Sequence, residues 1–239
     1  MIRLENLTKK YGEYTAVSNL SLSIPKGEIF GFIGPNGAGK TTTIKMMGGI
    51  MDPTSGSIDI CGISMQDEPE KAKKNIGFIP DRPYLYEKLT GKEFLRFIGN
   101  LYGVDNRSFT AKAEEKLSMF SILAWADELI ESYSHGMKQR LVMAAALLHD
   151  PEVIIVDEPM VGLDPVAVRM VKDLFKHLSA QGLTIFMSTH TLKVAEDVCD
   201  RIGIINKGIL IALGTPLELR GKTDLLNADL EDVFIKLTS

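Results

Sequence analysis

The sequence predicts an α/β fold organised around a parallel sheet that is covered on both faces. Three largely apolar runs support this prediction, at residues 29–33, 153–156 and 184–187. Continuous apolar runs without polar alternation are typical of strands that are buried on both faces of a parallel sheet. Ligands of such sheets collect at the carboxyl ends of the strands. We therefore expect the functional residues just after these three runs.

The first apolar run leads into a glycine-rich loop, GPNGAGKTT at positions 34–42, which is followed by a predicted helix at residues 43–47. Strand, loop and helix form the context of the phosphate-binding pattern G-x-x-x-x-G-K-[S/T]. The loop glycines allow a tight turn and a close approach of backbone N–H groups to phosphate oxygens. Lys40 is expected to contact the β- and γ-phosphates, and Thr41 to hold the accompanying Mg²⁺. The predicted phosphate-binding residues are Gly34, Pro35, Asn36, Gly37, Ala38, Gly39, Lys40, Thr41 and Thr42.

Two carboxylates, Asp157 and Glu158, follow the second apolar run. The predicted sheet brings them to the same edge as the glycine loop. Phosphoryl transfer to water needs one carboxylate to hold Mg²⁺ and one to polarise the attacking water, and we expect Asp157 and Glu158 to take these roles in that order. His190 follows the third run at the same edge, so a phosphate contact is favoured over a purely structural role.

Four further stretches carry strand signals. Residues 2–33 are expected to form short strands, the last of them the buried strand before the glycine loop. Residues 57–60 alternate between polar and apolar side chains, as a half-buried strand does. Residues 75–80 predict another strand, which ends at a proline. Residues 202–211 predict a hairpin with its turn at Asn-Lys-Gly.

Residues 84–149 show helical rather than strand periodicity, and we expect them to form a helical subdomain inserted into the α/β core. Thr90 and Glu93 form a capping box at one helix start. The apolar stripe behind them is either subdomain core or a groove for a partner helix. Asp164, which is followed by a proline, is predicted to be the N-cap of a later helix. The tail ends in an amphipathic segment at residues 230–237.

The composition is that of an ordinary globular chain. It has 239 residues, of which 45% are hydrophobic and 24% charged, so a sizeable core can be buried. The net charge of −4 argues against a dedicated nucleic-acid binder. The longest apolar run, residues 141–148, is too short to cross a bilayer, and no signal peptide is expected. Cys61 and Cys199 are expected to be reduced thiols rather than a disulfide or metal site.

Taken in order, these motifs resemble the ATP-binding subunit of an ABC transporter over nearly the whole length. The resemblance includes the glycine loop, the segment YSHGM at 133–137, the Asp157–Glu158 strand end, the segment GLD at 162–164, and His190. It implies a P-loop NTPase core with an N-terminal antiparallel β part and an inserted helical subdomain, together one ABC ATPase domain. In that division, residues 1–83 and 150–215 form the core, 84–149 the helical subdomain and 216–239 a C-terminal tail.

The resemblance also implies roles that the residues alone do not. Tyr11 matches the aromatic residue that stacks on the base of ATP; without the resemblance a packing role is favoured for it. Residues 133–137 match the family's signature segment, which caps ATP that is bound by a second copy of the subunit. Each copy therefore holds half of each site. The implied residues of this segment are Ser134, His135, Gly136 and Met137. The implied dimer loop consists of Gly162, Leu163 and Asp164.

Three positions depart from the family pattern. Asp81 stands where glutamine is usual, and it is either a ligand of Mg²⁺ or a loop residue. His135 replaces the first glycine of the signature, so its backbone cannot approach a phosphate as closely, although its ring can donate a hydrogen bond. Met137 replaces the usual glutamine. With Ser134 and Gly136 retained, the segment is still expected to bind phosphate.

The function expected from the resemblance is that of an ATPase that uses ATP and Mg²⁺. Two copies, identical or different, close on ATP and thereby move a separate membrane-spanning permease, in the manner of bacterial multidrug or ABC-2 exporters. Glu158, Lys40 and His190 are the expected catalytic residues, with Ser134 of the opposed copy. The implied location is the cytoplasmic face of the membrane, reached through the permease. The alternatives are a soluble non-transport ABC-type ATPase and a weakly hydrolysing regulatory subunit.

Overall fold

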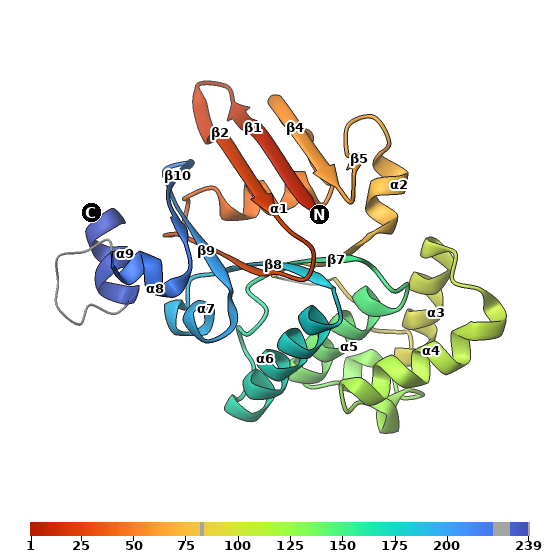
Figure 1. Ribbon diagram of the computed structural model, residues 1–239. Helices are drawn as coiled ribbons and strands as arrows, with labels where there is room; N and C mark the ends of the chain where they lie inside the picture. The colour runs from red at the N-terminus through yellow and green to blue at the C-terminus, as the bar shows by residue number, and fades with distance from the viewer. Residues whose placement is uncertain (82–83, 222–229, 239) are drawn as a thin grey trace.

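The computed structural model describes residues 1–81, 84–221 and 230–238, which form two sheets with helices between and around them (Figure 1). The antiparallel sheet has the strand order β2-β1-β4-β5 and contains β1 (Ile2–Tyr11), β2 (Tyr14–Ile24), β4 (Ser55–Ile60) and β5 (Ile63–Ser64). The second sheet has the order β10-β9-β3-β8-β7-β6 and contains β3 (Ile29–Ile33), β6 (Ile76–Ile79), β7 (Val153–Asp157), β8 (Thr184–Thr189), β9 (Arg201–Asn206) and β10 (Ile209–Gly214). Its strands run parallel except for β10.

The helices lie in three places (Figure 1). Helix α1 (Lys40–Met47) lies between the sheets, and α2 (Pro69–Lys74) follows the antiparallel sheet. A helical segment connects β6 to β7 and contains α3 (Gly91–Tyr102), α4 (Asn106–Met119), two short 3₁₀ turns (Leu123–Trp125 and Ile130–Ser132) and α5 (His135–Leu147). The remaining helices are α6 (Pro165–Ala180), α7 (Leu192–Val198), α8 (Pro216–Arg220) and α9 (Leu230–Thr238).

Each face of the parallel sheet is covered by its own hydrophobic core. The core on one face lies against the antiparallel sheet and α1, and Phe186 packs within it against Phe30 and Phe32, with ring centroids 5.7 and 5.4 Å apart. The core on the other face, which includes Met187 and Val171, lies against α5, α6 and α7 and continues into the helical segment. This arrangement confirms the predicted α/β class with a parallel sheet buried on both faces.

The expectation of short strands was wrong for residues 2–24 and is confirmed for β3, which has 5 residues. Strands β1 and β2 have 10 and 11 residues and pair over their full length. Their register shifts between Leu4 and Leu7, and the backbones of Asn6 and Asn19 take positive φ values of 49° and 51°. Because a bulge adds a residue to one strand, it interrupts the alternation of polar and apolar side chains. The interruption made two long strands resemble several short ones.

Several local predictions are confirmed. Thr90 and Glu93 form the capping box at the start of α3, with hydrogen bonds of 2.8 and 3.1 Å. The Asp164 carboxylate accepts two backbone N–H bonds at the start of α6, each 2.9 Å long. Strands β9 and β10 form the predicted hairpin. Helix α1 begins at Lys40, three residues before the predicted start, because the loop lysine already belongs to its first turn.

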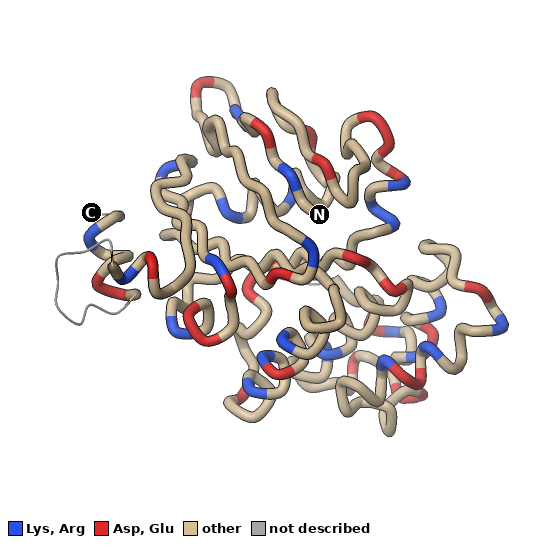
Figure 2. Tube along the Cα trace, viewed as in Figure 1, with Lys and Arg blue, Asp and Glu red and all other residues tan. Residues whose placement is uncertain are grey.

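Charged residues of both signs occur along the whole described chain (Figure 2). Figure 2 shows lysine and arginine interspersed with aspartate and glutamate along the trace. Within the described residues, no helix combines the length and apolar character needed to cross a membrane.

Gly77 of β6 offers a test of how tightly α5 packs on the sheet. A Cβ atom at this position would lie 2.4 Å from Ile154 Cδ1 and 2.5 Å from the Ala146 carbonyl oxygen. We expect Gly77→Ala to lower the free energy of unfolding by about 1–3 kcal/mol, as overpacking of a core does. Gly221→Ala is the control, because its Cβ would meet nothing closer than 3.6 Å. Equal urea midpoints for both variants would contradict the packing argument.

Candidate functional site

A pocket of about 560 Å³ lies at the carboxyl edge of the parallel sheet. Its lining comes from the hairpin end of β1 and β2, the glycine loop with the start of α1, and the ends of β7 and β8. The lining residues are Tyr11, Tyr14, Ala16, Asn36, Gly37, Ala38, Gly39, Lys40, Thr41, Thr42, Asp81, His135, Asp157, Glu158, Val161 and His190. Most of the predicted site residues therefore meet in one pocket.

At two of its glycines, the loop is held in place by backbone contacts that leave no room for a side chain. A Cβ at Gly34 would lie 2.3 Å from the Ile205 carbonyl oxygen, and a Cβ at Gly39 would lie 2.5 Å from the Ala16 carbonyl oxygen. Gly39 also has φ 107°, which other residues rarely adopt, and it is the residue before α1. The loop therefore presents its N–H groups at the start of α1, where the helix dipole favours an anion.

Lys40 is the buried cation of the pocket. Its Nζ donates to the carbonyl oxygens of Gly34 and Pro35 at 2.7 and 3.2 Å, and the residue is 8% exposed. Burial lowers the pKa of Lys40 from its usual range, while the negative charges of Glu158 and Asp157 oppose that shift. A cation with few waters around it interacts more strongly with an incoming anion than a solvated cation does.

Asp157 is fixed by two hydroxyl groups. Thr41 Oγ1 donates to one carboxylate oxygen at 3.1 Å, and Ser188 Oγ donates to the other. Ser188 is paired with Asp157 in the register of β7 and β8, and both residues are buried. The carboxylate therefore has one fixed orientation beside the Thr41 hydroxyl. A carboxylate next to a hydroxyl is a donor set that suits Mg²⁺, which prefers oxygen ligands.

Glu158 and His190 form the second polar pair of the pocket. His190 Nδ1 lies 2.7 Å from Glu158 Oε1, and the Glu158 side chain is 13% exposed, against 58% for His190. The Glu158 backbone has φ 51°, and its N–H donates to the Ser188 carbonyl at 3.1 Å. If Nδ1 donates to the carboxylate, a second donation from Nε2 to a phosphate requires the imidazolium form. The pair thus places a carboxylate in direct contact with a hydrogen-bonding ring at the edge of the pocket.

The other end of the pocket is aromatic. Tyr11 and Tyr14 are cross-strand partners at the tip of the β1–β2 hairpin, and both line the pocket. The Tyr11 hydroxyl donates to Met51 Sδ at 2.9 Å, and Lys9 Nζ lies 5.5 Å from the centre of its ring. These contacts hold the Tyr11 ring in place. A flat base fits such a surface by stacking.

The predicted signature residues lie at the start of α5. Ser134 is the residue before the helix and accepts the Met137 N–H at 3.3 Å. His135 lines the pocket described above, whereas Ser134, Gly136 and Met137 are not among its lining residues. The predicted dimer loop packs beside them within the same chain, since a Cβ at Gly136 would lie 3.8 Å from Leu163 Cδ2.

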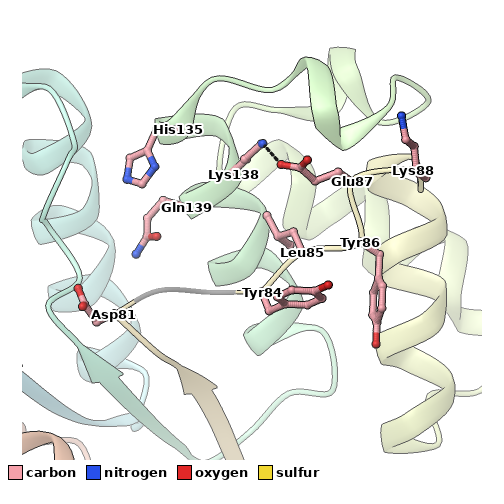
Figure 3. A pocket seen from close by; sticks show the side chains of 9 residues that line it. All are labelled: Asp81, Tyr84, Leu85, Tyr86, Glu87, Lys88, His135, Lys138 and Gln139. Atoms are coloured by element: carbon pink, nitrogen blue, oxygen red, sulfur yellow. Dashed lines mark hydrogen bonds and ion pairs between the residues drawn. The ribbon is translucent and has the colours of Figure 1, made fainter.

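A second pocket, of about 630 Å³, adjoins the first and shares Asp81 and His135 with it (Figure 3). Its other lining residues include Tyr84, Tyr86 and Gln139. In Figure 3 the His135 and Gln139 side chains project from α5 on the side that faces Asp81. Asp81 lies two residues beyond β6, at the same edge of the sheet as Asp157. Asp81 thus lines the same pocket as Thr41 and Asp157.

Three pocket residues and one supporting residue were not predicted. Tyr14, Ala16 and Val161 line the pocket, and Ser188 orients Asp157. The second tyrosine three positions after Tyr11 was a usable signal, because a tight hairpin places such residues opposite each other. The polar Ser188 in an otherwise apolar strand was another signal. Val161 carried none.

Comparison with known proteins identifies the family. Residues 17–161 match the family model for ABC transporters. The chain belongs to the ABC transporter family. As an ATP-binding subunit of that family, it is an ATPase that powers a separate membrane permease.

Three similar proteins illustrate this membership. The linearmycin resistance ATP-binding protein LnrL of Bacillus subtilis is 42% identical over 238 residues, which cover 100% of this chain and 75% of that protein. A solved ATP-binding subunit of an ABC transporter superimposes with a TM-score of 0.93 at 33% identity over all of both chains. A dimeric ATP-binding cassette in a post-hydrolysis state, bound to ADP and Pi, gives a TM-score of 0.79 at 28% identity over 90% of this chain and 98% of that one.

Tyr14 provides a test of the aromatic end of the ABC subunit's pocket. We expect Tyr14→Ala to weaken ATP binding by roughly tenfold, because one stacking partner of the base is lost. Binding of inorganic tripolyphosphate, which has no base, should be unchanged. The control is Tyr84→Ala, which removes a tyrosine outside this pocket. Calorimetry with both ligands measures the difference, and equal losses for ATP and tripolyphosphate would refute a contact with the base.

Proposed function

We propose that this chain hydrolyses ATP at the pocket described above, with Glu158 as the residue that orients and deprotonates the attacking water. The observation that supports this most directly is the Glu158–His190 hydrogen bond beside buried Lys40 and the glycine loop. The carboxylate is one residue beyond β7, so it follows the strand whose last residue is held against Thr41. A base in that position faces a γ-phosphate that the loop presents.

Three donors stabilise the negative charge that develops on the phosphate oxygens. Lys40 approaches from the loop, and its burial makes its charge effective. His190 approaches from the end of β8, with its ring oriented by Glu158. Ser134 of a second copy is the third donor. The leaving group is ADP, and the proton from water passes to Glu158.

Thr41 and Asp157 are the residues that hold Mg²⁺, with Asp81 as a further candidate ligand. Their oxygens lie side by side, and Ser188 prevents the Asp157 carboxylate from turning away. When bound, the ion neutralises charge on the β- and γ-phosphates. The protein's own contribution is the fixed position of these two oxygens.

Two subunits, identical or different, close around two ATP molecules. The signature residues Ser134, His135, Gly136 and Met137 of one subunit face the ATP of the other, and the loop Gly162–Leu163–Asp164 lies between the subunits. The exposed position of Ser134 at the start of α5 supports this geometry, because helix starts bind phosphate. ATP then shifts the population from open to closed dimers through its contacts with both subunits.

The permease that this ATPase drives is an exporter, and it holds the subunit at the cytoplasmic face of the membrane. The linearmycin resistance relative supports export of a toxic compound. The substrate is determined by the permease. The regulatory-subunit alternative rests on the departures at Asp81 and His135, and a hydrolysis assay of the purified chain separates it from the main proposal.

Glu158→Gln tests the proposed base. We expect ATP hydrolysis to fall by about 10²- to 10⁴-fold, because the amide cannot accept the proton from water. ATP binding should persist, so light scattering should detect a dimer only when ATP is present. Glu152→Gln is a matched control, since Glu152 pairs with Lys26 outside the pocket. A Glu158→Gln variant that hydrolyses ATP near the wild-type rate would exclude this role.

Asp157→Asn tests the proposed metal ligand. We expect the Mg²⁺ concentration needed for half-maximal hydrolysis to rise by roughly tenfold or more, since a neutral amide binds the ion less well. ATP binding in excess EDTA should be the same in variant and wild type. Asp59→Asn is the control, because Asp59 lies in β4 and outside the pocket. An unchanged Mg²⁺ requirement would remove Asp157 from the metal site.

A further inference from the structure

The His135 imidazole occupies the space next to Gly162. A Cβ atom at Gly162 would lie 2.6 Å from His135 Nε2 and 2.7 Å from its Cδ2. Real Cβ atoms do not approach other atoms so closely, so a side chain at 162 would displace the exposed His135 ring from this position. The two residues are 27 positions apart in the sequence and belong to different elements, the start of α5 and the turn between β7 and α6.

Gly162 lies in a turn of defined shape. The Leu163 N–H donates to the Met160 carbonyl at 3.4 Å, and Gly162, the third residue of that turn, has φ 78°. This is the geometry of a type II turn, which requires positive φ at its third position. Leu163 packs against the core and lies near Gly136 on α5. The turn therefore rests on the start of α5 at two points, through His135 and through Gly136.

The same turn is connected directly to the proposed base. The Val161 N–H donates to the Glu158 carbonyl at 3.3 Å, and Val161 lines the pocket together with Glu158 and His135. Glu158 itself has a backbone φ of 51°. Two successive turns thus connect Glu158 to Gly162, and any displacement of Gly162 moves the backbone that carries Val161 and follows Glu158.

We propose that His135 is a positioning residue for hydrolysis, and that its imidazole acts by holding the Met160–Leu163 turn against α5. The ring packs on Gly162, and the Met160–Leu163 turn then fixes the backbone on the C-terminal side of Glu158. The inference rests on the proposed function, because hydrolysis is its readout. It assigns a role within one chain to a side chain that stands where the family has glycine.

The test is a set of paired substitutions. Gly162→Ala introduces a Cβ into the imidazole, and we expect kcat to fall by roughly ten- to hundredfold, as misplaced catalytic groups cause, with KM for ATP little changed. His135→Ala removes the ring and leaves a good helix former at the first position of α5. The double variant His135→Ala, Gly162→Ala should recover most of the kcat lost in Gly162→Ala, because the clash is gone.

Gly103→Ala is the matched control for backbone strain. Gly103 has φ 74°, close to that of Gly162, but a Cβ there would meet nothing within 4 Å. Adding His135→Ala to Gly103→Ala should restore no kcat, because a Cβ at Gly103 has no contact with the imidazole to relieve. His135→Phe tests the mode of action, since its ring fills the same space without a hydrogen-bonding nitrogen. We expect its kcat to exceed that of His135→Ala by roughly threefold or more, because packing against Gly162 is restored.

Two results would overturn the proposal. One is a loss of kcat on Gly162→Ala that is equally large in the wild-type and in the His135→Ala background. This result would show that backbone strain alone is responsible. The other is a loss of kcat in His135→Phe as large as that in His135→Ala, which would assign the ring a hydrogen bond to phosphate instead. Failure of the proposed function is distinguishable from both, because the wild-type chain would then show no hydrolysis before any variant is compared.

Discussion

The site depends on the close approach of three backbone segments to the glycine loop. The Ile205 carbonyl lies against Gly34, the Ala16 carbonyl lies against Gly39, and the Gly208 N–H donates to the Ala38 carbonyl at 2.9 Å. These segments belong to β9, β2 and the β9–β10 turn. Both sheets therefore contact the loop, and its shape depends on these tertiary contacts as well as on its own sequence.

These contacts also explain why the antiparallel sheet belongs to the site. The Gly208 carbonyl accepts the Ser18 N–H at 2.8 Å, which ties the hairpin of one sheet to β2 of the other. The tip of β1 and β2 carries Tyr11 and Tyr14, so the same connection that holds the loop also sets the distance between the aromatic and phosphate ends of the pocket. The nucleotide contacts therefore rest on one rigid unit.

Much of this was predictable because the signals are local or depend on simple topology. The glycine loop is a contiguous pattern, and the apolar runs before Asp157 and His190 identify strands whose carboxyl ends must share an edge. The pairing of Glu158 with His190 follows from the same topology. The lengths of β1 and β2 were not predicted, because the bulges at Asn6 and Asn19 interrupt the two-residue alternation of polar and apolar side chains. The packing of His135 on Gly162 joins distant residues, and no local signal reports it.

Helix α5 has a mechanical consequence through its burial. Its residues Leu141–Leu147 are all buried, and its far end lies so close to β6 that Gly77 admits no side chain against Ala146. A helix whose last seven residues are all buried cannot rotate about its axis without opening cavities, and the 13 residues of α5 span about 20 Å. The helix thus connects the Ser134 end directly to β6, and Asp81 lies two residues beyond that strand. Suppose that a ligand at one end of this helix changes the affinity for a second ligand at the other end. By thermodynamic reciprocity, the second ligand then changes the affinity for the first by the same factor.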